Sequence, residues 1–168
     1  YGASYKNTIS GGRGNDVIVA GDSQDTYLFN RGDGQDSVTD YGGTDKLVFG
    51  EGIALSDLVV SRSGNNLLVK VLDAASPESS DQLTIVGWDS AIYRIETFEL
   101  ADGTVLTARE ISDLAMAGTD AADTITLWSD GLFTDGKDGD DVIQSGSNNA
   151  TLLGGDGNDR ITDSYGSD

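Results

Sequence analysis

Hydrophobic residues follow two different patterns along this chain of 168 residues. In residues 2–48 and 118–168, single aliphatic residues recur every nine positions and are separated by polar stretches rich in glycine. In residues 49–117, glycine is sparse and apolar residues alternate with polar ones over short runs. Alternation with a period of two predicts half-buried strands, whereas a fixed longer period predicts a solenoid of repeats. We therefore predict an all-β chain in three parts, residues 1–48, 49–117 and 118–168.

The middle part contains the turn and helix signals of a small β-rich domain. Residues 63–66 and the pair Asp102 and Gly103 are turn sequences that join strands. Thr107 and Glu110 have the spacing of a capping box, which predicts a short helix. The expected strands are residues 58–62, 67–72, 83–88, 93–100 and 104–106, and the expected helices are residues 55–58 and 107–117.

Three stretches share one nine-residue pattern, namely residues 11–19, 136–144 and 154–162. In each, a glycine-rich turn precedes an aspartate at the sixth position and an aliphatic residue at the eighth. The period extends through both arrays, apart from two inserted residues, Phe29 and Asn30, in the first. Each repeat has essentially one inward apolar residue, so its burial cannot offset the backbone entropy lost by so many glycines.

A bound cation would supply the missing stabilisation. Of the 24 aspartates, 18 lie in the two arrays, whereas all five glutamates lie between them. A short carboxylate reaches an ion held against its own turn, whereas a longer one overshoots. Glycine-rich turns aim backbone carbonyls inward, and Ca²⁺ takes six to eight oxygen ligands at roughly 2.3–2.6 Å. We therefore expect several Ca²⁺ ions in the arrays.

In these nonapeptides the chain resembles the RTX calcium-binding repeat proteins. The resemblance implies a parallel β-roll in which two repeats make one turn and each ion lies between turns eighteen residues apart. Carried onto this sequence, Asp16 pairs with Asp36 and Asp25 with Asp45, at offsets of twenty because of the two inserted residues. Asn7 with Asp25 forms a weaker site. The residues expected to form the sites are Gly11, Gly12, Gly14, Asp16, Asp25, Gly32, Gly34, Asp36, Gly43, Asp45, Asp123, Gly136, Gly139, Asp141, Gly154, Gly155, Gly157 and Asp159.

In the second array the resemblance implies ions on one edge only. Asp123, Asp141 and Asp159 follow one another at the strict period and form two sites. The opposite edge loses the aspartate in two repeats, so we expect it to be empty or poor. Its residues are Leu132, Ala150 and Asp168.

The middle part resembles the haemolysin-type calcium-binding related domain. That domain follows the repeats in many RTX toxins and secreted enzymes, where it caps the roll and promotes its folding. The resemblance therefore implies a β-rich cap with one or two short helices. The stretches that carry it are residues 25–29, 31–36, 49–53, 87–88, 93–96 and 101–104.

Charge and composition exclude several functions. The net charge of -19, from 29 acidic and 10 basic residues, argues against nucleic acid and anionic membranes as partners. The absence of cysteine and histidine excludes disulfides, thiolate nucleophiles, imidazole bases and the usual zinc ligands. No apolar run approaches the length of a membrane span. Both ends lie inside repeats, so we expect a piece of a longer protein.

Together these features predict a calcium-dependent structural module of a larger secreted bacterial RTX protein, exported by type I secretion and folding on Ca²⁺ outside the cell. Its expected partners are calcium and the rest of the parent polypeptide. The alternative is an adhesin module that binds a glycan or cell surface through calcium.

Two other groups of side chains have a functional and a structural interpretation. Trp88, Tyr93 and Phe98 suit a carbohydrate platform, although aromatic residues at strand spacing are more often core. Glu96, Glu99 and Asp102 could form a catalytic set, but nothing distinguishes them from ordinary charges on the face of a strand, so we predict no enzyme. We expect the run from Arg94 to Glu96 to form a surface ion pair.

Overall fold

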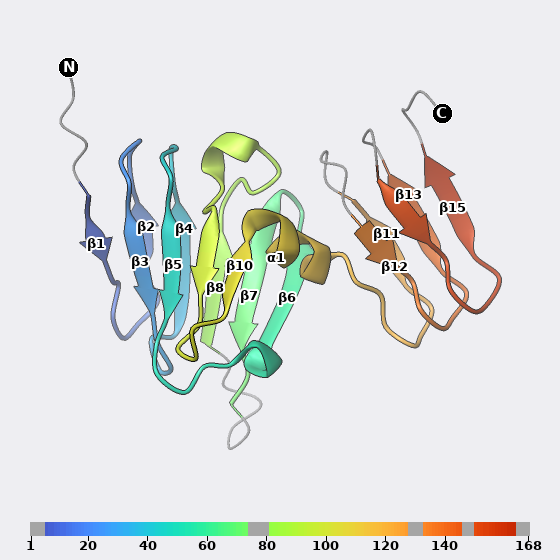
Figure 1. Ribbon diagram of the computed structural model, residues 1–168, viewed down its shortest axis with the longest axis horizontal. Helices are drawn as coiled ribbons and strands as arrows, with labels where there is room; N and C mark the ends of the chain where they lie inside the picture. The colour runs from blue at the N-terminus through green and yellow to red at the C-terminus, as the bar shows by residue number, and fades with distance from the viewer. Residues whose placement is uncertain (1–5, 74–80, 128–132, 146–149, 164–168) are drawn as a thin grey trace. The chain divides into compact units, whose positions relative to one another are not determined.

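The computed structural model describes residues 6–73, 81–127, 133–145 and 150–163, and the chain forms two compact units, residues 1–111 and 112–168 (Figure 1). Both units are built from short strands arranged as a solenoid, which confirms the predicted all-β roll. The three-part division stays a prediction. The elements up to the unit boundary are β1 Thr8–Ile9, β2 Val17–Val19, β3 Thr26–Phe29, β4 Gln35–Thr39, β5 Lys46–Phe49, η1 Leu55–Asp57, β6 Leu58–Ser63, β7 Asn66–Val71, β8 Asp81–Ile85, η2 Ala91–Tyr93, β9 Thr97–Glu99, β10 Val105–Thr107 and α1 Ala108–Ala115, which spans it. The second unit continues with β11 Thr124–Thr126, β12 Phe133–Asp135, β13 Val142–Ser145, β14 Thr151–Leu153 and β15 Arg160–Asp163.

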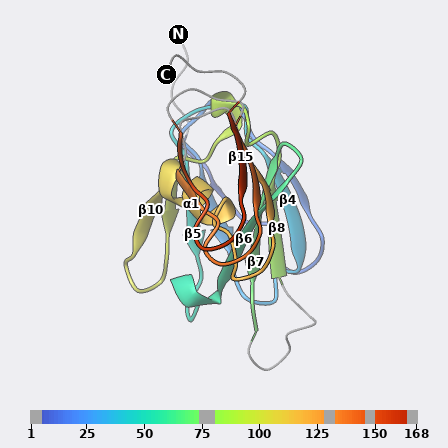
Figure 2. The ribbon, with the colours of Figure 1, turned by 90° about the vertical axis from the view of Figure 1, so that its right-hand side faces the viewer.

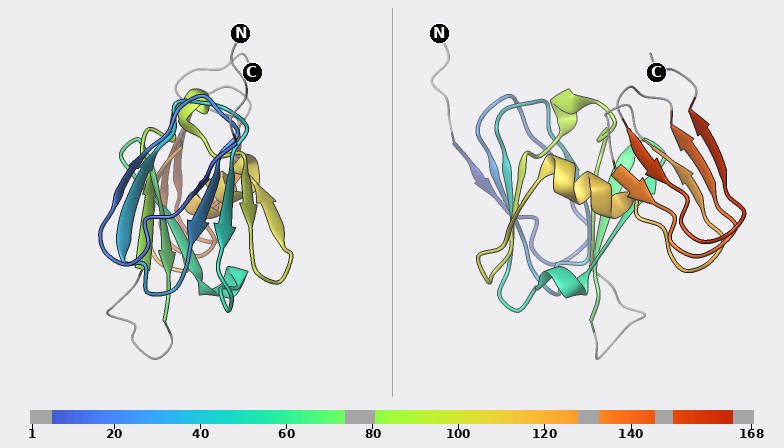
Figure 3. Two further views of the ribbon diagram at one scale, coloured as in Figure 1. Left: turned by 90° about the vertical axis from the view of Figure 1, so that its left-hand side faces the viewer. Right: turned by 45° about the vertical axis from the view of Figure 1, so that its right-hand side comes forward.

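Successive repeats of the first unit alternate between two sheets, with strand orders β1-β3-β5-β9-β10 and β2-β4-β8-β7-β6 (Figure 3). Two repeats therefore make one turn of the roll. The parallel register joins Thr8 to Thr26, an offset of 18 residues, and Thr26 to Lys46, an offset of 20. Of the two inserted residues, Phe29 is the last residue of β3 and Asn30 begins the turn after it, where the Asn30 backbone N–H donates to the Asp33 carboxylate at 2.8 Å. The expected offsets are thus confirmed.

The middle part continues both sheets of the first array. β8 pairs in parallel with β4, and β9 pairs in parallel with β5. Beyond these two strands the pairing becomes antiparallel. In one sheet β7 pairs with β8 and β6 pairs with β7, and in the other β10 pairs with β9. The expected strand over residues 93–100 was too long, because the chain pairs with β5 only over Thr97–Glu99 and forms the short 3-10 helix η2 just before it.

The core of the first unit lies between its two sheets. Trp88 and Phe98 are fully buried and their rings meet edge to face, with centroids 5.9 Å apart. Leu47 and Ile85 are also fully buried. The helix α1 begins with the predicted capping box, in which the Glu110 carboxylate accepts the Thr107 N–H at 2.8 Å and the Glu110 N–H donates to the Thr107 hydroxyl at 3.2 Å.

The second unit is a roll with a strict period, and its last strand β15 is at the front in Figure 2. β11, β13 and β15 form one parallel sheet, and β12 and β14 form another, with partners 18 residues apart throughout. Its described buried aliphatic residues between the sheets are Ile125, Leu127 and Ile143, whereas Ile161 on β15 is 46 % exposed. This unit therefore has little apolar burial to stabilise it.

Candidate calcium sites between the turns

Aspartates at the sixth repeat position connect consecutive turns of each roll. In the first unit, the Asp16 N–H donates to Asp36 Oδ1 at 2.9 Å and the Asp25 N–H donates to Asp45 Oδ1 at 2.7 Å. The Asn7 N–H donates in the same way to Asp25 Oδ1 at 3.1 Å. We call each such series a carboxylate ladder. The structure brings together the pairs that the sequence predicted in this unit.

The second unit contains one ladder of the same kind. The Asp123 N–H donates to Asp141 Oδ1 at 2.8 Å, and the Asp141 N–H donates to Asp159 Oδ1 at 3.0 Å. Asp141 therefore contacts both of the other aspartates. On the opposite edge, Leu132 and Asp168 lie outside the described residues, so the expectation of an empty edge stays a prediction.

At four ladder positions of the described structure, the second carboxylate oxygen of the aspartate has no hydrogen-bond partner. These atoms are the buried Oδ2 atoms of Asp16, Asp25, Asp45 and Asp141. A buried charged oxygen without a partner is costly, because it has lost its water and gained nothing in exchange. Calcium is a hard cation that prefers carboxylate and carbonyl oxygens, so the donor set fits it.

The glycines of the turns make room for this arrangement. A Cβ atom on Gly11, Gly136 or Gly154 would lie 2.8, 2.1 or 2.2 Å from the Oδ2 atom of the aspartate in the same repeat. Other glycines pack against backbone carbonyl oxygens of the preceding turn, at 2.0 Å or less from an added Cβ. These are Gly34, Gly43, Gly155 and Gly157. The remaining predicted glycines have positive φ, which favours glycine at the turns, and they are Gly12, Gly14, Gly32 and Gly139.

In the first unit, burial and neighbouring charges disfavour the ionised state of three aspartates in the absence of a cation. Burial, together with the neighbouring carboxylates of Asp40, Glu96 and Asp25, raises the pKa of Asp45 to about 7. Burial also raises the pKa of Asp36 and of Asp40. A divalent cation would reverse this preference, because it attracts the ionised carboxylates.

Three acidic residues at the end of the first array were missed by the sequence analysis. Glu96 was expected at the surface, but its Oε2 accepts the Asp45 N–H at 2.6 Å and so takes the next place on the ladder. Asp81 accepts the N–H groups of Gly32 at 2.7 Å and Gly34 at 2.9 Å. Asp40 is fully buried and accepts a hydrogen bond from the Tyr27 hydroxyl. The repeat period does not mark these positions, because two of them lie outside the arrays and Asp40 lies at the first rather than the sixth position of its repeat.

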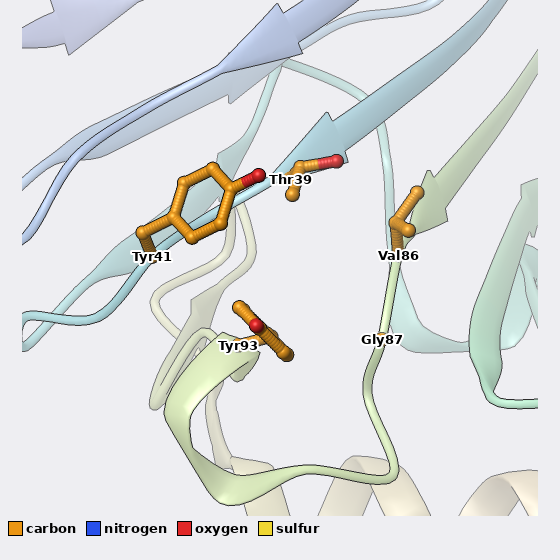
Figure 4. Close-up of a pocket in the computed structure, with 5 residues that line it drawn as sticks. All are labelled: Thr39, Tyr41, Val86, Gly87 and Tyr93. Carbon is orange, nitrogen blue, oxygen red and sulfur yellow. The ribbon is translucent and has the colours of Figure 1, made fainter.

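The three aromatic residues that could have formed a carbohydrate platform do not lie together on one surface. Trp88 and Phe98 are core residues, as the structural interpretation predicted. Tyr93 instead faces Tyr41, with ring centroids 5.7 Å apart, across a pocket of about 220 Å³ (Figure 4). Thr39, Val86 and Gly87 complete its lining. This pocket is open to solvent, since Tyr41 is 53 % exposed.

Comparison with known families agrees with this geometry. Residues 1–35 and 135–162 match the RTX calcium-binding nonapeptide repeat, and residues 66–110 match the haemolysin-type calcium binding protein related domain. The chain is therefore an RTX repeat protein with a haemolysin-type related domain between its two arrays. Its repeats make it a calcium-binding module.

Two individual proteins resemble it in part. The iron-regulated protein FrpA of Neisseria meningitidis serogroup C is 34 % identical over 123 residues, which is 68 % of this chain and 11 % of FrpA. The chain thus spans about a tenth of this curated relative. The extracellular lipase LipA from Serratia marcescens aligns with 96 % of this chain and 28 % of its own at 23 % identity, with a TM-score of 0.26, which is too low to indicate a shared overall arrangement. Among the described residues, none of the helices has the length and apolar character needed to cross a membrane.

Proposed function

We propose that the chain is a folding module of a larger exported protein, and that calcium outside the cell switches on its structure. The observation that carries this proposal is the set of buried, unpartnered Oδ2 atoms on Asp16, Asp25, Asp45 and Asp141. Without a cation these carboxylates repel one another in a chain whose net charge is already -19. Because calcium binds the folded turns and not the unfolded chain, its binding free energy becomes folding free energy. Affinities of order 10⁻⁴–10⁻³ M would keep the chain unfolded in a calcium-poor cytosol and fold it after export.

Removal of calcium tests this proposal. Circular dichroism of the intact chain in millimolar Ca²⁺ should show β-structure that is largely lost from the arrays when a chelator is added. Magnesium at the same concentration is the control, because it demands a smaller octahedral site and retains its waters. Identical spectra with calcium and with chelator would show that the arrays fold without metal and would overturn the proposal.

We further propose that the middle part caps the first array. Glu96 and Asp81 accept backbone N–H groups that the last repeats would otherwise leave without partners, and β8 and β9 cover the edges of β4 and β5. Terminal turns of solenoids need such cover, because an open strand edge presents unpaired backbone groups.

Arg31 ties the same end of the array to the cap. Its guanidinium donates to the carbonyl oxygens of Gly52 at 3.1 Å and Leu72 at 2.7 Å, and it forms an ion pair with Asp57 at 2.7 Å. One side chain therefore connects the turn after β3 to three points of the middle part. This arrangement supports a cap that stabilises the array through direct contacts.

Truncation and a point variant test the cap. A fragment of residues 1–48 should fold at higher calcium and less cooperatively than a fragment of residues 1–117. In the intact chain, Glu96→Ala should raise the calcium midpoint of the first unit, because it leaves the buried Asp45 N–H without an acceptor. Glu99→Ala is the matched control, since it removes only a partly exposed ion pair with Lys46. An equal midpoint for the two fragments would identify the middle part as an independent domain.

A second candidate function is calcium-dependent glycan binding at the pocket of Tyr41 and Tyr93. The observation that favours it is the position of Tyr41, an exposed aromatic residue that directly follows the buried Asp40. Calcium bound beside Asp40 would therefore hold this wall of the pocket in place. Aromatic faces stack on the apolar faces of sugars, and the pocket also offers hydroxyl groups. A glycan array probed with and without Ca²⁺ tests it, with Tyr41→Ala as the loss-of-binding variant. Absence of calcium-dependent binding to any glycan would remove this candidate.

A further inference from the structure

The first unit contains a group of three buried carboxylates that the repeat pattern does not provide. Asp25, Asp40 and Asp45 are each 2 % exposed or less, and one ligand oxygen from each lies within 4.8 Å of the others. In the described parts of the chain, these are the only three carboxylates that meet in this way. We call them the three-aspartate cluster. Asp25 and Asp45 belong to the ladder, whereas Asp40 is the additional member.

Asp40 stands at the first position of its repeat, which is glycine in the three clearest repeats at Gly11, Gly136 and Gly154. At Gly11, Gly136 and Gly154 an added Cβ would lie 2.8 Å or less from the ladder aspartate of the same repeat, so a side chain does not fit there. At Asp40 the local backbone accommodates a full carboxylate beside Asp45. The cluster is therefore a local departure from the repeat geometry.

Two observations point to a ligand in the cluster. The Oδ2 atoms of Asp25 and Asp45 are buried and accept no hydrogen bond, although both side chains are almost fully buried. Two oxygens bound to the same Ca²⁺ at about 2.3–2.6 Å lie at most about 5 Å apart, so a spacing within 4.8 Å suits one shared ion.

Asp40 is held in place by two donors that leave it free to coordinate. The Gly42 N–H donates to its Oδ1 at 2.7 Å, and the Tyr27 hydroxyl donates to its Oδ2. Each carboxylate oxygen has two lone pairs, so both oxygens keep one for a metal. Tyr27 is itself 1 % exposed, and this fixed donor positions the carboxylate before an ion arrives.

We propose that Asp40 is a third carboxylate ligand, and that it makes the ion shared with Asp25 and Asp45 the most tightly bound calcium of this chain. The proposal rests on the function proposed above and deepens it. The other ladder positions bring one carboxylate from each of two turns to the ion, whereas this site brings three. Because the affinity of calcium sites rises with the number of charged ligands, this site fills first and starts the folding of the first array.

Calorimetric titration of the intact chain with Ca²⁺ tests the assignment. Asp40→Asn keeps the shape and the acceptor for Tyr27 but removes the charge. It should weaken the tightest binding step by about tenfold or more, while the number of bound ions stays the same. Asp40→Gly introduces the residue found at the equivalent positions Gly11, Gly136 and Gly154 and should give the same result. Asp22→Asn is the matched control, because Asp22 is an exposed aspartate of the same array, and it should leave every step unchanged.

The outcomes separate the inference from the proposed function. If the unaltered chain binds no calcium, both fail. If it binds calcium and Asp40→Asn and Asp40→Gly bind with unchanged affinity, only the inference fails, and Asp40 is then a partner for Tyr27 and Gly42 alone.

A crystal structure of the calcium-loaded chain decides the point even if both variants fail to fold. An Asp40 oxygen at about 2.3–2.6 Å from the ion supports the assignment. Separation of the Asp40 carboxylate from the ion by a water molecule or by protein atoms would overturn it.

Discussion

Replacement of Asp141 by alanine should remove two calcium ions from the second unit. Asp141 is 1 % exposed, its Oδ1 accepts the Asp123 N–H, and its own N–H donates to Asp159. It lies between the other two aspartates, so both sites of the ladder share it. Its Oδ2 is one of the buried atoms without a hydrogen-bond partner.

The magnitude follows from linkage. For a dissociation constant of about 10⁻⁴ M, 10 mM Ca²⁺ stabilises the folded unit by about 2.7 kcal/mol for each ion. Loss of both ions therefore costs about 5 kcal/mol. The net stability of a small domain is of the same order, about 5 kcal/mol at the lower end of the usual range. The variant should consequently leave the second unit unfolded at calcium concentrations that fold the unaltered chain.

Ion counting by calorimetry and hydrogen exchange resolved by segment provide the assay. Asp141→Ala should lose two ions and lose exchange protection in residues 133–145 and 150–163, while the first unit keeps its protection as an internal control. Ala150→Ser is the matched control at the equivalent position of the opposite edge, and it should change neither quantity. Equal losses in the two variants would show that the ladder is not the calcium-binding edge, whereas the loss of only one ion from Asp141→Ala would show that the two sites do not share Asp141.

The remaining predictions concern pH and the cap. In calcium-free buffer, the folded fraction of the first unit measured by circular dichroism should be larger at pH 5 than at pH 8, because the folded pKa of Asp45, about 7, exceeds its ordinary value near 4. This contribution of Asp45 to stability is complete below its ordinary pKa and is lost as the pH rises through 7. Asp45→Asn should therefore abolish the pH dependence, and an unchanged pH dependence in that variant would assign the effect to other groups. Arg31→Ala should destabilise the first unit by about 1 kcal/mol, because it removes the donor to the carbonyl oxygens of Gly52 and Leu72 and to the carboxylate of Asp57, all of which water can partly replace at this exposed position. Denaturation midpoints measure that loss, and a stability equal to that of the unaltered chain would show that the Arg31 contacts are not needed for the cap.

Most of the strand pairing in the roll could be predicted from the repeat period. A fixed spacing places residues eighteen apart on neighbouring strands of one sheet, so the pairing of Ile125 with Ile143 could be read from the sequence. The two inserted residues at Phe29 and Asn30 shifted this offset to twenty, and the structure has the same value for Ile18 and Val38. Register follows from the period because each repeat contributes the same turn and the same short strand.

The residues that complete the first array could not be predicted in the same way. Glu96 follows Asp45 on the ladder at a separation of 51 residues, because a hairpin and loops of irregular length lie between them. No sequence period covers such a distance, and the pairing depends on how β9 docks on β5. Asp40 was missed for a different reason. The first position of the repeat varies in residue type, so a carboxylate there is compatible with an exposed turn, and only the structure shows that Asp40 is buried.

We expect the two units to differ in how strongly their structure depends on calcium. In the first unit, the middle part supplies large buried side chains, including Trp88 and Phe98, to the same pair of sheets that contains the first ladder. In the second unit, strands of three or four residues enclose few buried aliphatic side chains, such as Ile125 and Ile143. Apolar burial can therefore offset part of the repulsion between carboxylates in the first unit but little of it in the second. We therefore expect calcium binding to supply a smaller share of the folding free energy in the first unit than in the second.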